Sequence, residues 1–267
     1  MGIKIITFNI RYDKPDPGNY RWEVRKNAVA SLIYEYAPDI IGTQEVKVNQ
    51  LLDLQQLLPN YYSLGGDRRG TGDDEHCTIF YHKDKLNCLD HGDFWLSETP
   101  DIPGSITSSW GNHLPRIASW ARFNVVEDNR QIVIINTHLD YDSKKARELG
   151  AKLIFDSLQT EKLNPDKESL IIVTADFNDQ PGSIARNTFL NPLKNGLYLL
   201  DVLSDLKLSN QMTYNDFTDK AFLPIDTIYY DSRLNLHSVK VENKKYDGIL
   251  PSDHFPVVAE FNTSFSV

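Results

Sequence analysis

The stretch that decides the fold is SLIIVTADFND, residues 169–179, in which an apolar run meets acidic and amide side chains. The run 170–173 has the composition of a buried strand, and Asp176 and Asn178 follow it two positions apart. Side chains alternate between the two faces of a strand, so residues two apart point to the same side. Asp and Asn also favour turns through local hydrogen bonds, so this stretch alone is compatible with a polar turn. The rest of the chain decides between the two interpretations.

Other apolar runs carry polar side chains at their ends in the same way. The residues concerned are Asn9, Glu45, His138, Asp226, Asp253 and His254. Each has an ordinary explanation as a turn former, a helix cap or a strand terminator. Gathered at one sheet edge, however, the carboxylates would repel each other, and a divalent cation would relieve that repulsion. Carboxylate and amide oxygens suit Mg²⁺ or Mn²⁺ better than zinc, and the histidines could bind phosphate or transfer protons.

The pattern of apolar residues predicts helices and strands in mixed order. Helices are expected over 22–36, 48–58, 144–159 and 184–193. Strands are expected over 3–8, 39–45, 61–64, 77–81, 86–96, 118–125, 130–138, 170–175, 197–201, 225–230, 234–242 and 255–261. Strand and helix do not alternate strictly, which favours a mixed sheet system with helices on its outer faces.

Length and composition indicate one globular domain spanning residues 1–267, with 40% hydrophobic and 24% charged residues and no linker-like break. No apolar run approaches the ~18 residues of a membrane span. The opening residues, MGIKIITFNIRYD, resemble a strand rather than a signal peptide. Cys77 and Cys88 are too few for a disulfide framework and form no C-x-x-C, so buried free thiols are expected. The default expectation is a cytoplasmic location.

The acidic charge balance bears on the substrate class. The formal net charge is −9 and the sequence pI is about 5.2. Proteins that bind duplex DNA usually carry a basic patch, because phosphate contacts dominate their affinity. The composition therefore favours small or single-stranded phosphoesters over long duplex DNA.

The segment GGDRRGTGDDEH, residues 65–76, is the part of the sequence nearest to a phosphate-binding loop. It lacks the pattern G-x-x-x-x-G-K-[ST] and does not lead into a helix. We expect a solvated loop, with Arg68 and Arg69 as charges at the rim of a site.

Six ordered motifs carry a resemblance to a known family. TFNIR, TQEV, NTHLD, ADFND, PIDTIYY and SDHFPV, spread across almost the whole chain, resemble the endonuclease/exonuclease/phosphatase superfamily, whose fold is similar to that of deoxyribonuclease I. RWEVRK, FWLSETP and PRIASWARF further resemble a bacterial branch related to the deadenylase and nocturnin type. Ala175 stands where the family has Gly, for which we expect only a backbone adjustment. The resemblance implies a four-layered α/β sandwich, with two face-to-face β-sheets and helices on both outer faces.

The resemblance also implies a cofactor site. Glu45 would bind Mg²⁺ or Mn²⁺ directly, Asn9 would lie beside it, and Asp253 would complete the metal side.

Catalytic roles follow from the same resemblance. His254 would be held by Asp226 in a His–Asp pair, and Asp176 is the other candidate to orient or deprotonate the attacking water. Asn178 and His138 would contact phosphate oxygens.

For six further residues the sequence leaves both a functional and a structural role open. Arg11 and Arg116 are candidates for contacts with the substrate phosphate, or ordinary sheet-edge arginines. Asp140 joins the site or caps the next helix. Trp22, Trp110 and His113 wall the pocket or, as is commoner for aromatic residues, belong to the core.

The expected function is therefore metal-dependent hydrolysis of a phosphodiester or phosphomonoester by water attack at phosphorus. The expected partner is a phosphoester substrate, including single-stranded nucleic acid or a nucleotide, and no membrane. The alternatives are a sphingomyelinase-like or inositol-phosphatase-like substrate, or a non-catalytic binding module that retains the fold. A zinc hydrolase is disfavoured because H-E-x-x-H and cysteine ligands are absent from the sequence.

Overall fold

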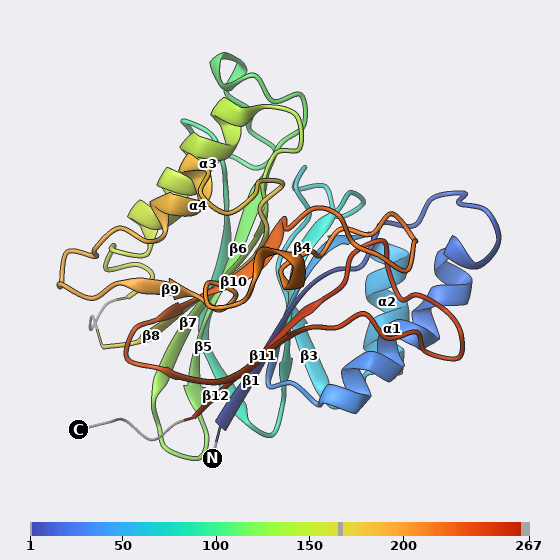
Figure 1. The fold of residues 1–267 in the computed structure, drawn as a ribbon. Coiled ribbons are helices and arrows are strands. Elements are labelled where there is room, and N and C mark those ends of the chain that lie inside the picture. The colour runs from blue at the N-terminus through green and yellow to red at the C-terminus, as the bar shows by residue number, and fades with distance from the viewer. Residues whose placement is uncertain (1, 165–167, 263–267) are drawn as a thin grey trace.

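The computed structural model describes residues 2–164 and 168–262, which form two six-stranded sheets flanked by helices (Figure 1). The first sheet has the strand order β11-β12-β1-β2-β4-β3, and the second has the order β5-β6-β7-β8-β10-β9. The strands of the first sheet are β1 (Gly2–Asn9), β2 (Ile40–Val46), β3 (Tyr61–Leu64), β4 (His76–His82), β11 (Asn235–Val241) and β12 (Val257–Asn262). Those of the second are β5 (Leu86–Trp95), β6 (Ile117–Val125), β7 (Gln131–His138), β8 (Leu170–Asp176), β9 (Leu199–Asp201) and β10 (Asp226–Asp231).

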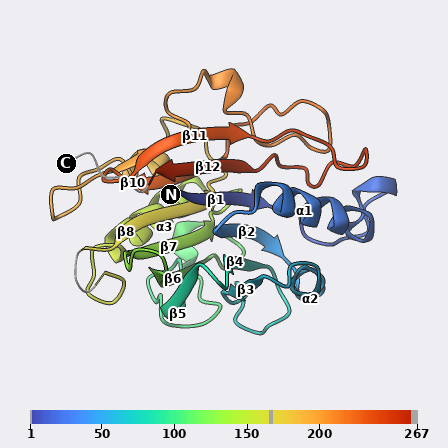
Figure 2. The same cartoon turned by 90° about the horizontal axis from the view of Figure 1, so that it is seen from below.

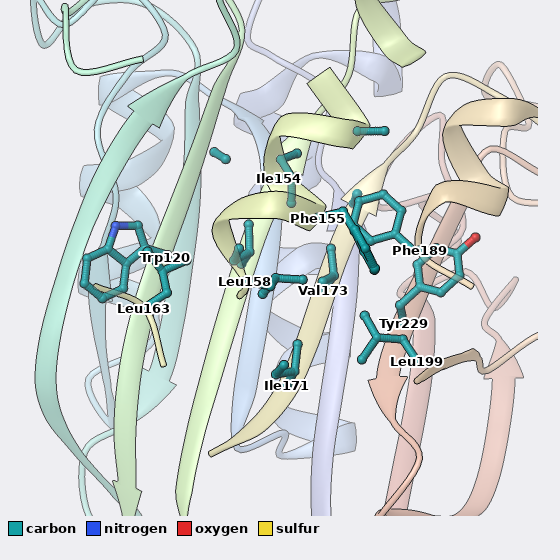
Figure 3. Close-up of a cluster of buried hydrophobic side chains, with 14 of the residues drawn as sticks. Trp120, Ile154, Phe155, Leu158, Leu163, Ile171, Val173, Phe189, Leu199 and Tyr229 are labelled. Carbon is teal, nitrogen blue, oxygen red and sulfur yellow. The ribbon is translucent and has the colours of Figure 1, made fainter. Parts of the chain in front are cut away.

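The helices cover the outer faces of the two sheets, which confirms the predicted four-layered α/β sandwich. α1 (Trp22–Tyr36) and α2 (Val48–Leu57) pack on the first sheet through one apolar cluster. α3 (Lys144–Ser157) and α4 (Ile184–Thr188) lie on the second sheet, where Phe155 and Phe189 meet strand residues such as Val173 (Figure 3). A third cluster fills the space between the sheets. The view from below shows the strands of both sheets with α1 and α2 outside them (Figure 2).

Local sequence signals explain most helix boundaries. α1 ends where Ala37 adopts a left-handed conformation with φ 42°, directly before Pro38. α3 begins after Ser143, whose hydroxyl accepts a hydrogen bond from the Ala146 N–H. The predicted helix 184–193 is too long, because Pro192 disfavours helical dihedrals at the residue before it and α4 ends at Thr188. Within the described ranges, no helix is both long and apolar enough to cross a bilayer. Cys77 is buried as predicted, whereas Cys88 is only half-buried, and both are free thiols.

A buried polar layer joins the two sheets. Gln44 Nε2 of β2 donates to Asn136 Oδ1 of β7 at 2.7 Å, and Asn136 Nδ2 donates to the Thr43 carbonyl at 2.8 Å. Thr174 Oγ1 of β8 donates to the same Asn136 oxygen at 3.1 Å. A Cβ at Gly42 would overlap with Thr174, so glycine allows the sheets to approach here. Because buried polar groups are costly unless paired, this layer favours one alignment of the sheets.

Strand β1 lies inside the first sheet between neighbours from opposite ends of the chain. It pairs in parallel with β2 and antiparallel with β12, with Gly2 opposite Asn262. β7 and β8 are likewise parallel. The carboxyl ends of these parallel pairs carry the polar residues that the sequence singled out.

Candidate active site

Strand register brings three of the predicted residues together on the second sheet. His138 at the end of β7 pairs with Asp176 at the end of β8, and Asp176 pairs with Asp226 at the start of β10. All three are buried, and His138 Nε2 lies 3.5 Å from Asp176 Oδ2. Paired residues on neighbouring strands point to the same face, so this edge presents an imidazole and two carboxylates side by side.

The predicted His–Asp pair is present. His254 Nδ1 lies 2.8 Å from Asp226 Oδ2, and His254 Nε2 lies 3.8 Å from Asp176 Oδ2. Burial alone would lower the pKa of His254, but the charges of Asp226 and Asp176 and the hydrogen bond to Asp226 raise this pKa to about 10. His254 is therefore an imidazolium at neutral pH, with Asp226 fixing the orientation of the ring.

The surroundings of Asp176 favour its neutral form, whereas those of His254 favour its charged form. Burial, followed by repulsion from Asp226, raises the pKa of Asp176 to about 7. Its Oδ2 accepts a hydrogen bond from Asn9 Nδ2 at 2.9 Å, and its Oδ1 accepts one from the Asn178 N–H at 2.9 Å. A carboxyl group that titrates near neutral pH is suited to proton transfer.

His138 and Asn178 form a unit of their own. Asn178 Nδ2 lies 2.8 Å from His138 Nε2 and donates to the Leu139 carbonyl at 3.0 Å. Burial, and next the charge of Arg116, lower the pKa of His138 well below its usual range, so the ring is neutral. Both amide hydrogens of Asn178 are thus used within the protein, and Asn178 positions His138 in this arrangement.

The first sheet contributes the residues predicted to bind metal. Glu45 Oε1 accepts a hydrogen bond from Asn9 Nδ2 at 3.0 Å, and Glu45 Oε2 accepts one from the Tyr12 N–H at 3.0 Å. Asp253 Oδ2 lies 3.4 Å from a guanidinium nitrogen of Arg11. Burial raises the pKa of Asp253, and repulsion from Glu45 adds to the rise, whereas the charges of His254 and Arg11 lower it. Glu45 and Asp253 therefore lie close enough to interact, with a cation on either side of Asp253.

Unusual backbone conformations occur at three site residues. Arg11, Glu45 and Asn178 have positive φ values of 61°, 64° and 48°. Glu45 lies where the pairing of β2 with β4 shifts between Thr43 and Val46, so the strand bulges there instead of ending at Glu45. Non-glycine residues in this region carry backbone strain that typically accompanies functional sites.

Two donor sets fit a hard divalent cation. Ligand atoms of Asp176, Asp226 and His254 lie within 4.8 Å of one another. Asp226 Oδ1 is buried with no hydrogen-bond partner among the described residues. To bind a cation at this set, His254 would have to lose its proton and its bond to Asp226, whereas Glu45 and Asp253 offer carboxylate oxygens without that conflict. The oxygen chemistry fits Mg²⁺ or Mn²⁺ at the Glu45 side.

A cavity of about 620 Å³ opens over these residues. Four cationic side chains line it: Arg11, Lys47, Arg68 and Arg116. Arg116 is buried and its Nε lies 3.2 Å from Asp140 Oδ2, while Asp140 Oδ1 accepts from the Ser143 N–H at 2.7 Å. Asp140 supports Arg116 and the turn before α3, whereas the N-cap of that helix is Ser143 and Asp140 itself does not line the cavity. The carboxyl groups of Glu45, Glu75, Asp176 and Asp253 line the same cavity, so it offers cationic contacts for a phosphate and oxygen ligands for a divalent cation.

The three aromatic candidates, Trp22, Trp110 and His113, do not line the cavity. Trp22 belongs to the core under α1 and donates from Nε1 to Asp53 Oδ2 at 2.8 Å. Trp110 is buried outside the cavity, and His113 is exposed. The cavity is lined instead by Tyr12, Tyr141 and Tyr214, which sequence reasoning missed because isolated tyrosines in loops carry no pattern.

The loop 65–76 also differs from the expectation of a solvated loop. Its residues 69–73 are exposed, but Asp67 and Asp74 are buried. Asp74 binds Lys47 Nζ at 2.8 Å and Arg69 Nε at 2.6 Å. This network brings Arg68 into the cavity together with Glu75, a residue that no pattern in the sequence singles out.

The facing sheets and the histidine–carboxylate rim define the deoxyribonuclease I-like class of α/β sandwich proteins. The chain belongs to the Endonuclease/Exonuclease/phosphatase family, whose sequence profile matches residues 6–254. Members of this family are hydrolases that act on phosphoesters and generally use a divalent metal. The family predicted from the six motifs is confirmed.

Solved structures support the family and the predicted branch. The mannosyl-6-phosphatase of Bacteroides thetaiotaomicron is 30% identical, with a TM-score of 0.86 and coverage of 97% of this chain and 99% of that chain. The human nocturnin catalytic domain is 21% identical, with a TM-score of 0.76 and coverage of 99% and 94%, which shows a shared fold. An uncharacterized protein of Acanthamoeba polyphaga mimivirus is 31% identical over 171 residues. That match spans 60% of this chain and 60% of the relative.

Proposed function

We propose that the protein is a Mg²⁺- or Mn²⁺-dependent phosphoesterase that hydrolyses a small or single-stranded phosphoester by water attack at phosphorus. The observation that carries the proposal is the His254–Asp226 pair facing Asp176 at the rim of a cavity with four cationic side chains. A cationic imidazole beside a carboxyl group of nearly neutral pKa supplies the acid and base that this hydrolysis needs.

The roles of the residues follow from their charges. Asp176 accepts the proton of the attacking water, because its pKa of about 7 makes it a base near neutral pH. His254, as imidazolium, donates to the phosphoryl group and stabilises the charge that develops there. His138 is neutral and its Nε2 accepts from Asn178 Nδ2, so its Nδ1–H is the group left to donate to a phosphate oxygen, without adding charge.

The metal would be held by Glu45 and Asp253, with Asn9 orienting Glu45 through its hydrogen bond. When bound, it supplies neutralisation of negative charge on the phosphoryl oxygens. Arg11 and Arg116 remain the proposed contacts to the substrate phosphate, and both line the cavity.

Support for a small substrate comes from charge and from one relative. The net charge of −9 disfavours long duplex nucleic acid. A relative 30% identical over nearly the full chain is named as a mannosyl-6-phosphatase, so hexose phosphates belong among the candidate substrates.

The test is a phosphoester panel measured with Mg²⁺, Mn²⁺ and EDTA. It contains bis-p-nitrophenyl phosphate, p-nitrophenyl phosphate, hexose 6-phosphates, oligo(A), abasic DNA and dinucleotides. We expect metal-dependent turnover that EDTA abolishes. Full activity in excess EDTA contradicts the metal assignment, and turnover of plasmid DNA in preference to every small ester contradicts the substrate class. Binding without any turnover would favour the non-catalytic alternative.

A further inference from the structure

Residues 67–76, hereafter the arm, form a loop beside the candidate active site and carry Arg68 and Glu75. Asp67 and His76 form a β-bridge at its base, and the Arg68 N–H donates to the Glu75 carbonyl at 2.9 Å. Arg68 and Glu75 also pair through their side chains, with 2.8 Å between NH1 of Arg68 and Glu75 Oε2. Both side chains line the cavity. The two charges are therefore presented together to whatever occupies it.

Hydrogen bonds within the arm, and contacts from Trp95 and Lys47 in other segments, hold the arm in place. Trp95 Nε1 donates to the Arg68 carbonyl at 2.6 Å. Asp67 accepts from the backbone N–H groups of Arg69 at 2.9 Å and Gly72 at 2.6 Å. Buried Asp74 ties the arm to Lys47 at the start of α2. A side-chain pair with such support keeps its geometry before a ligand arrives, which is what discrimination between ligands requires.

The position of the pair sets the distance from the reacting phosphate. Arg68, Glu75 and His138 line the same cavity, and with Glu45 and Arg116 they enclose behind it a recess of only about 10 Å³, which is too small for a ring. A group that Arg68 and Glu75 bind from the cavity is therefore attached close to the phosphate that His138 contacts. A nucleobase is separated from its 5′-phosphate by a ribose, whereas a sugar hydroxyl group lies directly beside its own phosphate.

The chemistry of the pair decides which group fits. Glu75 adds a carboxyl group to those of Glu45, Asp176 and Asp253 in the cavity, so a second phosphate beside it meets like-charge repulsion. A hydroxyl group both donates and accepts a hydrogen bond, and neighbouring hydroxyls match a carboxylate beside a guanidinium. Tyr141, 64% exposed at the rim, offers an aromatic face for the C–H side of a sugar ring.

We propose that Arg68 and Glu75 form a specificity site for adjacent hydroxyl groups, so that the substrate is a phosphomonoester of a sugar or another polyol. This inference rests on the proposed function, because it places the phosphate at His138 and His254. It makes Glu75 a determinant of which leaving group is accepted, separate from the residues that cleave the phosphate.

The experiment compares Glu75→Gln with the wild-type enzyme on four substrates. They are mannose 6-phosphate, glucose 6-phosphate, p-nitrophenyl phosphate and adenosine 3′,5′-bisphosphate. Glu75→Gln keeps the size of the side chain and removes its charge, and Glu23→Gln on the exposed side of α1 is the matched control. Binding of mannose 6-phosphate to each protein is also measured by calorimetry, so that a result does not depend on turnover.

We expect Glu75→Gln to lower kcat/KM for the hexose phosphates by ~10-fold or more relative to kcat/KM for p-nitrophenyl phosphate. The change should appear mainly in KM, because the variant loses a hydrogen bond between a charged group and the sugar. The bisphosphate should improve relative to the hexose phosphates, and Glu23→Gln should leave both ratios unchanged. Equal losses on all substrates, or a wild-type preference for the bisphosphate, would overturn the inference. If no phosphoester is hydrolysed, the proposed function fails, and calorimetry alone then decides: weaker sugar phosphate binding by Glu75→Gln supports the specificity site, and equal binding overturns it.

Discussion

The two sheets supply the active site in different ways. On the second sheet, His138, Asp176 and Asp226 occupy paired positions on three neighbouring strands. On the first sheet, Glu45 lies in a bulge with φ 64°, and Arg11 follows β1 with φ 61°. A hydrogen-bonded ladder fixes the direction of side chains by itself, whereas a left-handed residue depends on surrounding contacts. The half of the site on the second sheet is therefore inherent in a regular ladder, apart from Asn178 with φ 48°, while the half on the first sheet needs dedicated support.

That support comes chiefly from two buried side chains. Arg25 of α1 is fully buried and donates to the carbonyls of Ile10 at 2.8 Å and Pro251 at 2.7 Å. It also donates to the Arg11 carbonyl at 3.2 Å, and Gln50 Nε2 donates to the same carbonyl at 2.8 Å. Arg25 therefore connects the segment after β1 with the segment that carries Asp253. Strain of ~1–3 kcal/mol at each left-handed residue is offset by contacts of this kind.

The largest effect is expected where the two halves meet, at His254, which precedes β12 of the first sheet and binds Asp226 of the second. His254→Ala should lower kcat/KM by ~10³–10⁴-fold with an intact fold, because it removes the cation at the phosphate. Asp226→Asn should be severe but milder, since an amide still orients the ring without stabilising its charge. The double variant should be little worse than His254→Ala, because the two residues act as a unit.

Kinetics and thermal melts of the three proteins check this prediction. Multiplicative losses would mean that Asp226 acts independently of His254. A fall in Tm with retained activity would make His254 a structural residue.

The next effect concerns the irregular half. Glu45→Gln should lower activity by ~10²-fold or more, because it removes the carboxylate proposed to bind the metal. The midpoint of activation by Mg²⁺ should also move to higher concentration. An unchanged midpoint, measured by titration of metal into EDTA-treated protein, would place the metal at the Asp176–Asp226–His254 set instead.

Arg25 and Arg186 are both fully buried, so substituting each of them compares the first-sheet half of the site with the second-sheet half. Arg25 supports the first sheet's loops, while Arg186 lies under the second sheet and binds Asp201 and the Tyr229 hydroxyl. Replacing either with Met should lower the free energy of unfolding by ~2–4 kcal/mol, because polar partners lose a charged donor. Only Arg25→Met should also lower kcat, by ~10-fold, through displacement of Arg11 and Asp253. Equal kcat values for the two folded variants, after correction for the unfolded fraction in denaturant melts, would remove the special role of Arg25.

The smallest effect is a pH-dependent change in stability at Asp176. Its pKa is raised to about 7 from an ordinary value of 3.8, so the folded state holds this proton more tightly than the unfolded state. The stability contributed by this group is complete below its unfolded pKa and is lost as pH rises through about 7. In EDTA, Asp176→Asn should therefore raise Tm by a few degrees at pH 8 and by less at pH 5. A larger rise in Tm at pH 5 than at pH 8, measured by scanning calorimetry, would show that ionisation of Asp176 does not destabilise the folded state.

The difference between the regular strands of the second sheet and the bulge of the first also explains how much of the molecule could be predicted from sequence. The second sheet's residues end β-branched runs such as IVIINTH, and such runs reveal both the strand and the side on which its last residue lies. The six motifs then identified the family and the sandwich. Glu45 was selected correctly as a rim residue, but the sequence indicated a strand that ends there, because a bulge leaves no local pattern.

The arm with Arg68 and Glu75 was beyond sequence reasoning for a different reason. Its order depends on Lys47 and Trp95, which lie in other parts of the chain and meet it only after folding. Its glycines and charges have the composition of a solvated loop, as expected for residues 69–73. Local composition indicates only the structure that a segment would adopt alone, and this segment is organised by an ion pair with Lys47 and a hydrogen bond from Trp95.

The position of β1 between β2 and β12 has a consequence for biosynthesis. Asn9 and Glu45 are translated well before Asp253, His254 and β12, the antiparallel partner of β1. A nascent chain that lacks β12 therefore holds an incomplete site and an interior strand with one open edge. Hydrolytic competence should arrive abruptly once β12 has been made and has paired with β1, so chains truncated before β12 would be inert towards phosphoesters and recognisable to chaperones by that exposed edge.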